Sequence, residues 1–395
     1  MSRLEELIQE LCPNGVEYKK LGDIGQVKMC KRILKSQTNT IGGIPFYKIG
    51  TFGGEANSFI SKGLYEEYKE KYSYPKIGEI LISAAGTIGR TVVYDGEPAY
   101  YQDSNIVWLS HNESDVLNTF LRYCYELKPW SISSGGTIPR LYNDNILKAK
   151  IPVPPLEVQR EIVRVLDSFT LLTAELTAEL TARKKQYEYY RDKLLFSEES
   201  NVKSVPLGDI AKFVYGYTDK AKDIGSARFV RITDITEDGR LDPYNAKYIE
   251  LTTESSKYLL QKGDLLLART GATYGKTLYF DADEPAVYAS FLIKIILDNS
   301  IIKNRYYWHF SKSSLYWEQA ERYVSKGGQQ QFNTNAVSRV KVPIPSLEVQ
   351  DRIIKILDRF DALCNDITTG LPAEIEARQK QYEFYRDKLL SFKQL

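Results

Sequence analysis

The sequence is poor in the residue types from which metal and redox sites are built. It has four cysteines without a C-x-x-C pair, and its two histidines, His111 and His309, lie far from any cysteine. A metal site, a disulfide framework and a histidine-based catalytic triad are therefore not expected, and both histidines are interpreted as structural or surface residues. Widely spaced cysteines suit reduced thiols, so the sequence predicts a cytoplasmic protein.

Long apolar runs and a strong net charge are also missing. No run of about 18 apolar residues occurs, so no membrane span is expected. Residues 1–11 carry acidic side chains and helical spacing where a signal peptide would need an apolar core. The formal net charge is only +2 over 395 residues, so any nucleic-acid site must be a local patch.

Signatures of catalysis and cofactor binding are absent as well. Residues 271–277, GATYGKT, resemble a phosphate-binding loop, but three residues separate the glycines where that motif needs four. The sequence contains no N-P-P-[YF] or D-P-P-[YF] tetrapeptide of amino-methyltransferases, and no strand followed by G-x-G that would hold S-adenosylmethionine. The chain is therefore predicted to be non-catalytic and to hold no cofactor itself.

What the sequence does contain is a duplication. Residues 151–169, IPVPPLEVQREIVRVLDSF, return as residues 342–360, VPIPSLEVQDRIIKILDRF, with 10 of 19 positions identical. Residues 182–195 return as residues 377–390, with 12 of 14 identical. The period of about 190 residues is close to half the chain. A large unit is therefore present twice, which differs from a short solenoid repeat.

Both duplicated segments carry a helical heptad pattern. From Ile162 to Leu194, mostly apolar and aromatic residues recur at alternating steps of four and three, which is the seam of a coiled coil. The second segment has four extra residues, with Gly370 and Pro372 at the insertion, so we expect a continuous first helix and an interrupted second helix. The two helices are predicted to pack antiparallel on each other; packing of each helix on its own domain is the alternative.

A globular segment precedes each long helix. Both segments are rich in Gly, Tyr, Ile and Val in short strand-like runs, and both open with LGDI. The predicted fold is α+β, with two pseudo-symmetric globular α/β domains separated by two long helices in an antiparallel coiled coil. The expected order is an N-terminal helix and lead-in (residues 1–20), a first globular domain (21–150), a central helix (151–198), a second globular domain (199–341) and a C-terminal helix (342–395).

These features resemble the specificity subunits of type I restriction-modification systems. The resemblance covers nearly the whole chain and is carried by three paired motifs: P-x-P-x-L-E-x-Q at the helix starts, Q-Y-x-x-Y-R-D-K-L-L at the helix ends, and G-[DE]-[IL]-L-[IL]-x-x-x-G in each domain. Residues 173–180, TAELTAEL, look like the tetrapeptide repeat whose copy number alters spacer length in some members. The resemblance implies a non-catalytic subunit in which two target-recognition domains each read one half of a bipartite double-stranded DNA target.

The resemblance also implies partners and their cofactors. Two methyltransferase subunits would bind the helices and hold S-adenosylmethionine, and restriction subunits would hold ATP and Mg²⁺. Aromatic residues of the duplicated helix ends are candidates for methyltransferase docking, with aromatic packing between the helices as the alternative: Tyr187, Tyr190, Tyr382 and Tyr385. The alternative function is a non-catalytic two-domain adaptor that binds protein or glycan ligands, which the 29 tyrosines would suit.

Side chains that could contact DNA lie in loop-like or glycine-rich places. Lys and Arg bind phosphates, Gln suits adenine, and Arg suits guanine. In the first domain these candidates are Lys48, Thr51, Ser83, Thr87, Arg90, Gln102, Thr137 and Arg140. In the second domain they are Arg231, Arg269, Thr273, Lys276, Ser290, Lys326, Gln329, Gln330 and Gln331. For each of them a solvated loop side chain is an equally acceptable interpretation.

Overall fold

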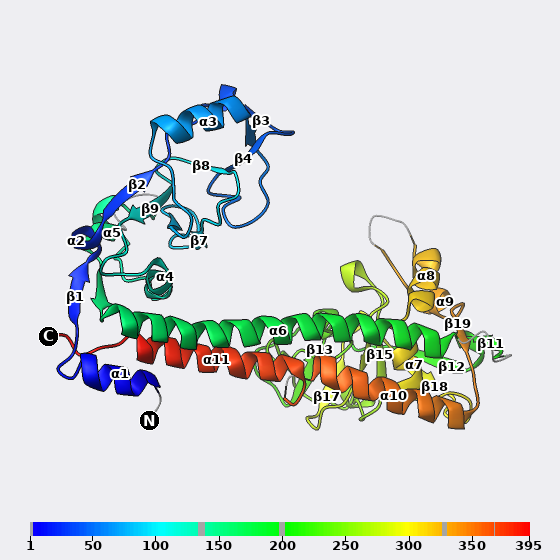
Figure 1. The fold of residues 1–395 in the computed structure, drawn as a ribbon. Helices are drawn as coiled ribbons and strands as arrows, with labels where there is room; N and C mark the ends of the chain where they lie inside the picture. The colour runs from blue at the N-terminus through cyan, green and yellow to red at the C-terminus, as the bar shows by residue number, and fades with distance from the viewer. Residues whose placement is uncertain (1–2, 133–138, 197–201, 326–329, 367) are drawn as a thin grey trace. The chain divides into compact units, whose positions relative to one another are not determined.

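The computed structural model describes most of the chain, namely residues 3–132, 139–196, 202–325, 330–366 and 368–395 (Figure 1). Backbone contacts divide the chain into two compact units. Unit 1 comprises Met1–Ala174 and Ala377–Leu395, and unit 2 comprises Glu175–Glu376. Each unit contains one globular domain together with part of the long helices.

Unit 1 contains three small β-sheets. A two-stranded antiparallel sheet joins β1 (Glu17–Lys20) to β10 (Lys150–Val153). A four-stranded antiparallel sheet has the strand order β2-β9-β6-β7, with the bounds Gln26–Met29, Ile106–Ser110, Ile80–Ser83 and Thr91–Val93. The third sheet has the order β3-β5-β4-β8, with the bounds Thr38–Asn39, Phe59–Ile60, Ile44–Tyr47 and Tyr100–Tyr101. In this sheet β4 and β8 run parallel.

Unit 2 repeats this arrangement. Strand β11 (Ser204–Pro206) pairs with β19 (Lys341–Pro343). The four-stranded sheet has the order β12-β18-β15-β16, with the bounds Ala211–Tyr215, Leu292–Leu297, Leu265–Ala268 and Thr277–Tyr279. The remaining sheet has the order β14-β13-β17, with the bounds Tyr248–Ile249, Ala227–Val230 and Ala286–Tyr288, and β13 and β17 run parallel. The sequence repeat is therefore a repeat of the fold, and the prediction of two pseudo-symmetric domains of mixed α and β structure is confirmed.

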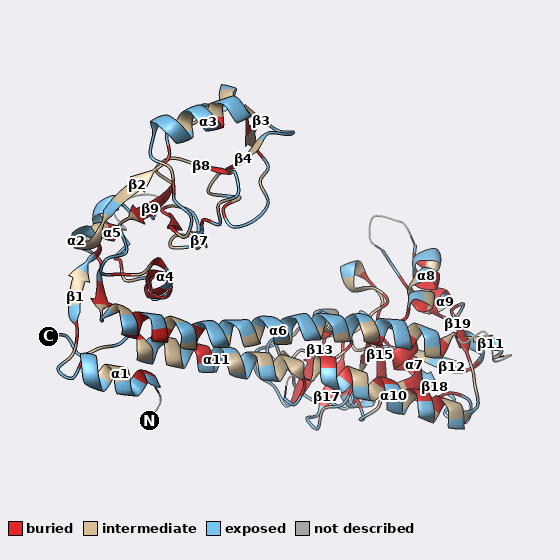
Figure 2. Cartoon of the chain, in the orientation of Figure 1, coloured by how far each residue is buried: buried red, intermediate tan, exposed pale blue. Residues whose placement is uncertain are grey.

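Short helices complete both domains. In unit 1 these are α1 (Arg3–Leu11), α2 (Leu21–Ile24), α3 (Lys62–Lys71), α4 (Asn118–Glu126) and α5 (Asn143–Lys148). In unit 2 they are α7 (Asn304–Phe310), α8 (Ser314–Tyr323) and α9 (Thr334–Val337). Figure 2 shows that α4 is largely buried, whereas α3 is largely exposed. Helix α4 therefore forms part of the domain core.

One of the two inner strands of each four-stranded sheet is buried on both faces, which explains its unbroken apolar sequence; this strand is β6 in unit 1 and β15 in unit 2, and we call it the central strand. In β6, Ile80 and Ile82 pack into the core that contains α4, whereas Leu81 packs into a second core beside Tyr100. Strand β15 shows the same alternation between two cores. The larger sheet is thus the middle layer of each domain.

The long helices follow the pattern that the sequence predicts. Helix α6 (Leu156–Leu195) runs for 40 residues without a break, whereas α10 (Leu347–Asn365) ends before α11 (Leu371–Leu389) begins (Figure 1). At the interruption, a Cβ atom on Gly370 would lie 2.6 Å from the carbonyl oxygens of both Ala362 and Asp366. Only glycine fits this close approach, so both predictions about helix continuity are confirmed.

The helices contact each other in the same way within each unit. In unit 1 the ring of Phe169 on α6 stacks on Tyr385 of α11, with ring centroids 5.3 Å apart and planes at 21°. In unit 2 the ring of Phe360 on α10 stacks on Tyr190 of α6, at 5.7 Å and 22°. Because Phe169 and Phe360 are duplicated positions, as are Tyr385 and Tyr190, each unit holds one copy of the same aromatic contact.

Candidate nucleic-acid interface

A glycine loop between two strands recurs in both domains. It joins β6 to β7 in unit 1, where Gly86 and Gly89 have φ of +63° and +78°, and β15 to β16 in unit 2, where Gly271 and Gly275 have φ of +71° and +80°. This left-handed conformation favours glycine. In both units the second glycine donates a backbone hydrogen bond to the last residue of the preceding strand, at 2.9 and 2.8 Å. The GATYGKT segment is therefore a tight turn of a kind that both domains share.

A tryptophan supports this turn in both domains. A Cβ atom on Gly89 would lie 3.2 Å from the ring of Trp130, and one on Gly275 would lie 3.0 Å from the ring of Trp317. The sequence gives no sign of this pairing, because neither tryptophan lies in a repeated motif. Each turn thus packs closely against a tryptophan of its own domain.

Two of the predicted side chains of unit 1 bind the backbone of the loop that follows β4. Gln102 accepts a hydrogen bond from the amide of Ile49 at 3.0 Å through its Oε1 atom. Arg90 donates through Nη1 to the carbonyl of Phe52 at 2.7 Å. Arg90 and Gln102 therefore both contact the same loop, at Phe52 and Ile49.

Other predicted side chains of unit 1 lie within turns. Ser83 is only 1% exposed, and its hydroxyl donates to the carbonyl of Thr87 and accepts from the amide of Arg90. Thr51 closes a short turn by accepting a hydrogen bond from the amide of Lys48 at 3.1 Å. Ser83 does not reach the surface in this conformation, whereas Thr87 and Arg90 are exposed.

Two arginines flank the turn before β9. Arg140 donates to the carbonyl of Ser104 at 2.8 Å, and Arg32, whose side chain is 70% exposed, forms an ion pair with Asp103 at 3.2 Å. The guanidinium of Arg140 also lies 6.0 Å from the ring centre of Tyr142. Both guanidinium groups therefore lie beside the turn at Ser104, where Asp103 offsets the charge of Arg32.

In unit 2 the corresponding surface is built around Arg269, the residue that follows β15. Its amide donates to the carbonyl of Phe291 at 3.1 Å, and its carbonyl accepts from the amide of Phe332 at 2.8 Å. The neighbouring Thr270 pairs with Gln331 as an isolated β-bridge. We call this surface the Arg269 edge, and the predicted side chains that it brings together are Arg269, Ser290, Gln330 and Gln331.

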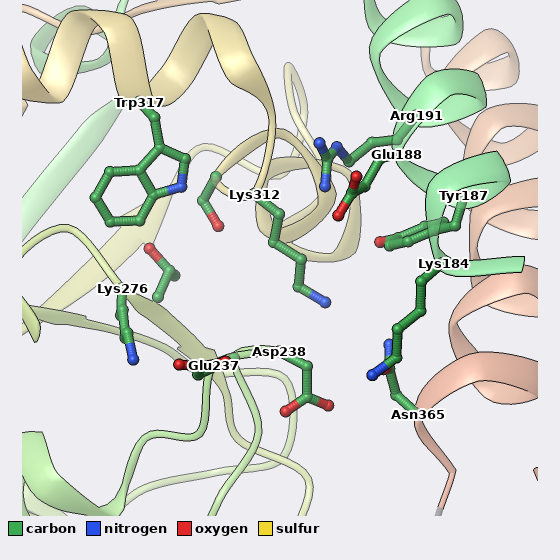
Figure 3. Close-up of a pocket in the computed structure, with 13 residues that line it drawn as sticks. Lys184, Tyr187, Glu188, Arg191, Glu237, Asp238, Lys276, Lys312, Trp317 and Asn365 are labelled. Atoms are coloured by element: carbon green, nitrogen blue, oxygen red, sulfur yellow. The ribbon is translucent and has the colours of Figure 1, made fainter. Parts of the chain in front are cut away.

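Three further predicted residues of unit 2 are engaged in other contacts. Arg231 forms an ion pair with the buried Asp234 through Nη2, at 2.6 Å, and donates to the carbonyl of Asn245. The hydroxyl of Thr273 donates within its own loop to Thr270 at 3.4 Å. Lys276 lines a cavity instead (Figure 3). Thr137, Lys326 and Gln329 lie outside the described residues.

The cavity beside Lys276 has a volume of about 350 Å³ and a lining of both charge signs. Figure 3 shows that Lys312 extends into it between helix α6 and the loop that carries Asp238. Burial lowers the pKa of Lys312 to about 7, an effect that the neighbouring Asp361 opposes. Because both acidic and basic groups line it, this cavity is not the positively charged groove that DNA phosphates require.

Equivalent polar contacts attach each domain to its long helix. In unit 2, Nε2 of His309 lies 2.8 Å from Asp358 of α10, and its Nδ1 lies 3.1 Å from the hydroxyl of Tyr187 on α6. In unit 1, Tyr123 stands in the place of His309 and donates to Asp167 of α6. Burial lowers the pKa of His309 to about 4, although its bond to Asp358 opposes this. His309 is thus a structural residue, as expected.

The four tyrosines proposed for docking differ in exposure. Tyr187 and Tyr382 are 5% and 6% exposed, so their rings pack inside units 2 and 1, in agreement with the alternative interpretation. Tyr190 and Tyr385, which stack on the other long helix of their unit, are less buried, and Tyr190 is 38% exposed. Docking of a partner at these positions stays a prediction.

In the described part of the chain, no group of three or more His, Cys, Asp or Glu is arranged to hold a metal ion. The same residues include no helix with the length and apolar character that crossing a bilayer requires.

Comparisons with known proteins agree on one family. The model of the type I restriction modification DNA specificity domain matches the chain twice, over residues 13–183 and 199–377. A putative type I restriction enzyme specificity subunit of Haemophilus influenzae is 57% identical over 180 residues, which is 45% of this chain and 47%, less than half, of that relative. A type I restriction enzyme specificity subunit of Escherichia coli is 36% identical over 298 residues, covering 70% of this chain and 72% of that one.

Solved structures support the same fold. The specificity subunit of M. genitalium matches with a TM-score of 0.57 at 17% identity, over 96% of this chain and 97% of that one. A chain from a study of assembly and conformational transition in a type I restriction-modification system matches with a TM-score of 0.62 at 15% identity, over 96% and 98%. The two matches of the family model cover most of the chain. The chain therefore belongs to the family of type I restriction-modification specificity subunits, as a non-catalytic subunit with two target-recognition domains.

Proposed function

We propose that this chain gives a type I restriction-modification complex its DNA sequence specificity, with each target-recognition domain reading one half of a bipartite target. One observation carries the proposal: two copies of one fold present equivalent loops, with exposed or half-buried Arg, Gln and Thr side chains, at the end of the same central strand. Two similar modules on one chain suit two half-sites whose separation follows from the geometry of the protein.

Two kinds of contact, to phosphates and to base edges, would act at each half-site. Lys and Arg contacts to phosphates position a protein on the duplex, and contacts to base edges in the major groove carry the sequence information. In unit 1, phosphate contacts would come from Arg140 and from the exposed Arg32, which would exchange its ion pair with Asp103 for a phosphate. In unit 2 the Arg269 edge combines an arginine with Gln330 and Gln331, side chains suited to guanine and to adenine.

The long helices would set the number of unread base pairs between the half-sites. Helix α6 has 40 residues, which corresponds to about 60 Å at about 1.5 Å per residue. Its first part contacts α11 within unit 1, and its last part contacts α10 within unit 2. An antiparallel coiled coil of these helices would keep the spacing fixed, since a paired helix bends less than a single one.

Partner subunits would supply the chemistry that this chain lacks. We propose that two methyltransferase subunits dock on the helices, near Tyr190 and Tyr385, and hold S-adenosylmethionine. Restriction subunits would join the same complex and hold ATP and Mg²⁺. A target adenine would be flipped into a methyltransferase pocket while this chain provides position. The complex would act in the cytoplasm, where reduced cysteines are stable.

Co-expression with the cognate methyltransferase subunit in a host without adenine methylation tests this function. Mapping of methylated adenines across the genome should return one bipartite motif with a fixed gap. The purified complex should also bind that motif with an affinity that falls steeply with salt, because counterions are released from phosphates. An adaptor for protein or glycan ligands would give neither result, and absence of a bipartite motif would reject the proposal.

A further inference from the structure

We propose that Arg269 is a specificity-determining residue that reads a guanine in the half-site bound by the domain of unit 2. The inference rests on the proposed DNA-reading function and names one base contact within it. It is carried by the way the Arg269 edge holds both the backbone and the side chain of this residue. All of the contacts involved lie within unit 2.

The backbone of Arg269 is fixed on both sides. Its amide donates to the carbonyl of Phe291 at 3.1 Å, and its carbonyl accepts from the amide of Phe332, which is fully buried, at 2.8 Å. The side chain therefore leaves from an anchored point at the end of the central strand β15. A mobile loop would give no such fixed direction.

The guanidinium group is held as well. Its Nε donates to the carbonyl of Ser290 at 3.1 Å, which uses the inner edge of the group. The guanidinium carbon lies 5.2 Å from the ring centre of Tyr215 and 5.5 Å from that of Phe291. The hydroxyl of Tyr215 lies 3.2 Å from the hydroxyl of Thr334, so one of the two flanking rings is itself anchored.

The two aromatic rings are not core residues. Tyr215 is 41% exposed and Phe291 is 50% exposed, although Phe is among the residue types that are most often buried. Exposed aromatic rings that flank a guanidinium orient it by cation–π contact and lower the entropy lost on binding. Their exposure therefore points to a surface prepared for a ligand.

The outer edge of this guanidinium matches guanine. Within the described residues, neither Nη atom of Arg269 has an acidic partner, so both remain available for a bidentate contact. The N7 and O6 atoms of guanine in the major groove accept such a pair of hydrogen bonds, and Arg–guanine is the commonest specific contact to DNA. A phosphate contact does not require this fixed orientation, because a flexible lysine can also bind a phosphate as a point charge.

The equivalent position of unit 1 explains why the two domains would read different bases. Ala84 follows β6, its amide donates to the carbonyl of Asn105 at 2.8 Å, and its carbonyl accepts from the amide of Leu141 at 2.9 Å. This is the backbone pattern of Arg269, but Ala84 is 1% exposed and has no polar side chain. The same backbone position therefore occurs in both domains, and only in unit 2 does it carry a side chain, Arg269, that could contact a base.

The test uses the methyltransferase complex formed with this chain and compares methylation rates on the target and on targets with single base-pair changes. The wild-type complex should depend on a G·C pair in the half-site that Arg269 contacts. Arg269→Ala and Arg269→Lys should both lower the discrimination at that pair by roughly 5- to 150-fold, the range of one bidentate contact, and leave the other half-site unchanged. Phe291→Ala should lower it in the same place by a smaller factor.

Arg322→Ala, at an exposed arginine of α8 in the same unit, is the matched control and should leave every position of the motif unchanged. A motif without a G·C pair in either half-site would overturn the inference. The inference would also be overturned if Arg269→Ala kept the wild-type motif but bound every target more weakly, and if Arg269→Lys restored that binding. This combination is what a phosphate contact predicts. These outcomes leave the proposed function intact, whereas a wild-type complex that methylates no bipartite motif rejects both.

Discussion

Gln159 and Gln350 are duplicated residues that make the same three hydrogen bonds in the two units, and both are completely buried. The Oε1 atom of each accepts a backbone amide at 2.9 Å, from Leu117 in unit 1 and from Lys303 in unit 2. The Nε2 atom of each donates to two backbone carbonyls, at 2.7 and 2.8 Å for Gln159 and at 2.9 Å twice for Gln350. The glutamine of the P-x-P-x-L-E-x-Q motif therefore fastens a long helix to its domain.

Replacing Gln159 with leucine should destabilise the protein by about 2–4 kcal/mol, because three backbone groups lose a hydrogen-bond partner that is itself completely buried. Gln350→Leu should cost a similar amount, because the environment is the same. Chemical denaturation followed by circular dichroism measures both. Arg160→Ala, at the exposed neighbouring position, should change the free energy of unfolding by less than about 0.5 kcal/mol. Equal stabilities of Gln159→Leu and the wild type would contradict this role.

Features with a local or periodic signal could be predicted from the sequence. The length of α6 follows from its heptad pattern, and the break between α10 and α11 follows from Gly370 and Pro372. The duplicated domains follow from repeated motifs. These signals depend on residues close together in the chain, which is why they can be read without coordinates.

Features that depend on distant packing could not be predicted. Ser83, the last residue of β6, is buried by a contact with the loop that follows it, whereas Thr87, four residues later in that loop, is exposed. Tyr215 and Phe291 resemble core aromatics in the sequence, and their exposure at the Arg269 edge emerges only when separate strands meet. Tyr123 and His309 occupy equivalent positions without any sequence identity.

Deletion of Thr177–Leu180, one copy of the TAEL repeat within α6, should change the gap of the methylated motif without changing either half-site. Four residues shorten a helix by about 6 Å and rotate the rest of the helix by roughly 40° beyond a full turn. Mapping of methylated adenines in cells that carry the variant complex measures the gap.

Insertion of one further TAEL copy is the matched control and should change the gap in the opposite direction. Loss of all methylation by the deletion variant is also consistent with a spacer whose two helices no longer align. An active variant with an unchanged gap would contradict the spacer role of α6.

Replacing Gly275 with alanine should destabilise unit 2 by about 1–3 kcal/mol, the usual cost of a non-glycine residue held in a sparsely populated backbone region. The φ of +80° disfavours a side chain, and the new Cβ atom would lie 3.0 Å from the ring of Trp317. Thermal unfolding of the variant measures the loss. Gly63→Ala in α3 is the control. No atom lies within 4 Å of the position that the new Cβ atom would take, and alanine is preferred to glycine in a helix by up to about 1 kcal/mol, so a small gain in stability is expected. A Gly275→Ala variant as stable as the wild type would show that this turn tolerates a side chain.

The stability of the protein should fall as the pH is lowered from about 6.5 to about 4, because of His309. Burial lowers the pKa of this side chain from 6.5 to about 4, so within that interval the unfolded chain binds a proton that the folded chain does not. The folded state is then favoured at higher pH, and the decline amounts to about 3 kcal/mol when it is complete. Urea unfolding at a series of pH values measures it.

His309→Gln removes the titrating group but keeps a side chain that can contact Asp358 and Tyr187. The variant should have a flatter profile between pH 4.5 and 6.5 than the wild type, whatever its stability at pH 7, because the remaining pH dependence comes from other groups. If stability changed with pH equally in His309→Gln and in the wild type, this prediction would be wrong. His309 would then bind its proton as readily in the folded protein as in the unfolded chain, and the contact between α7 and α10 would tolerate a charged imidazole.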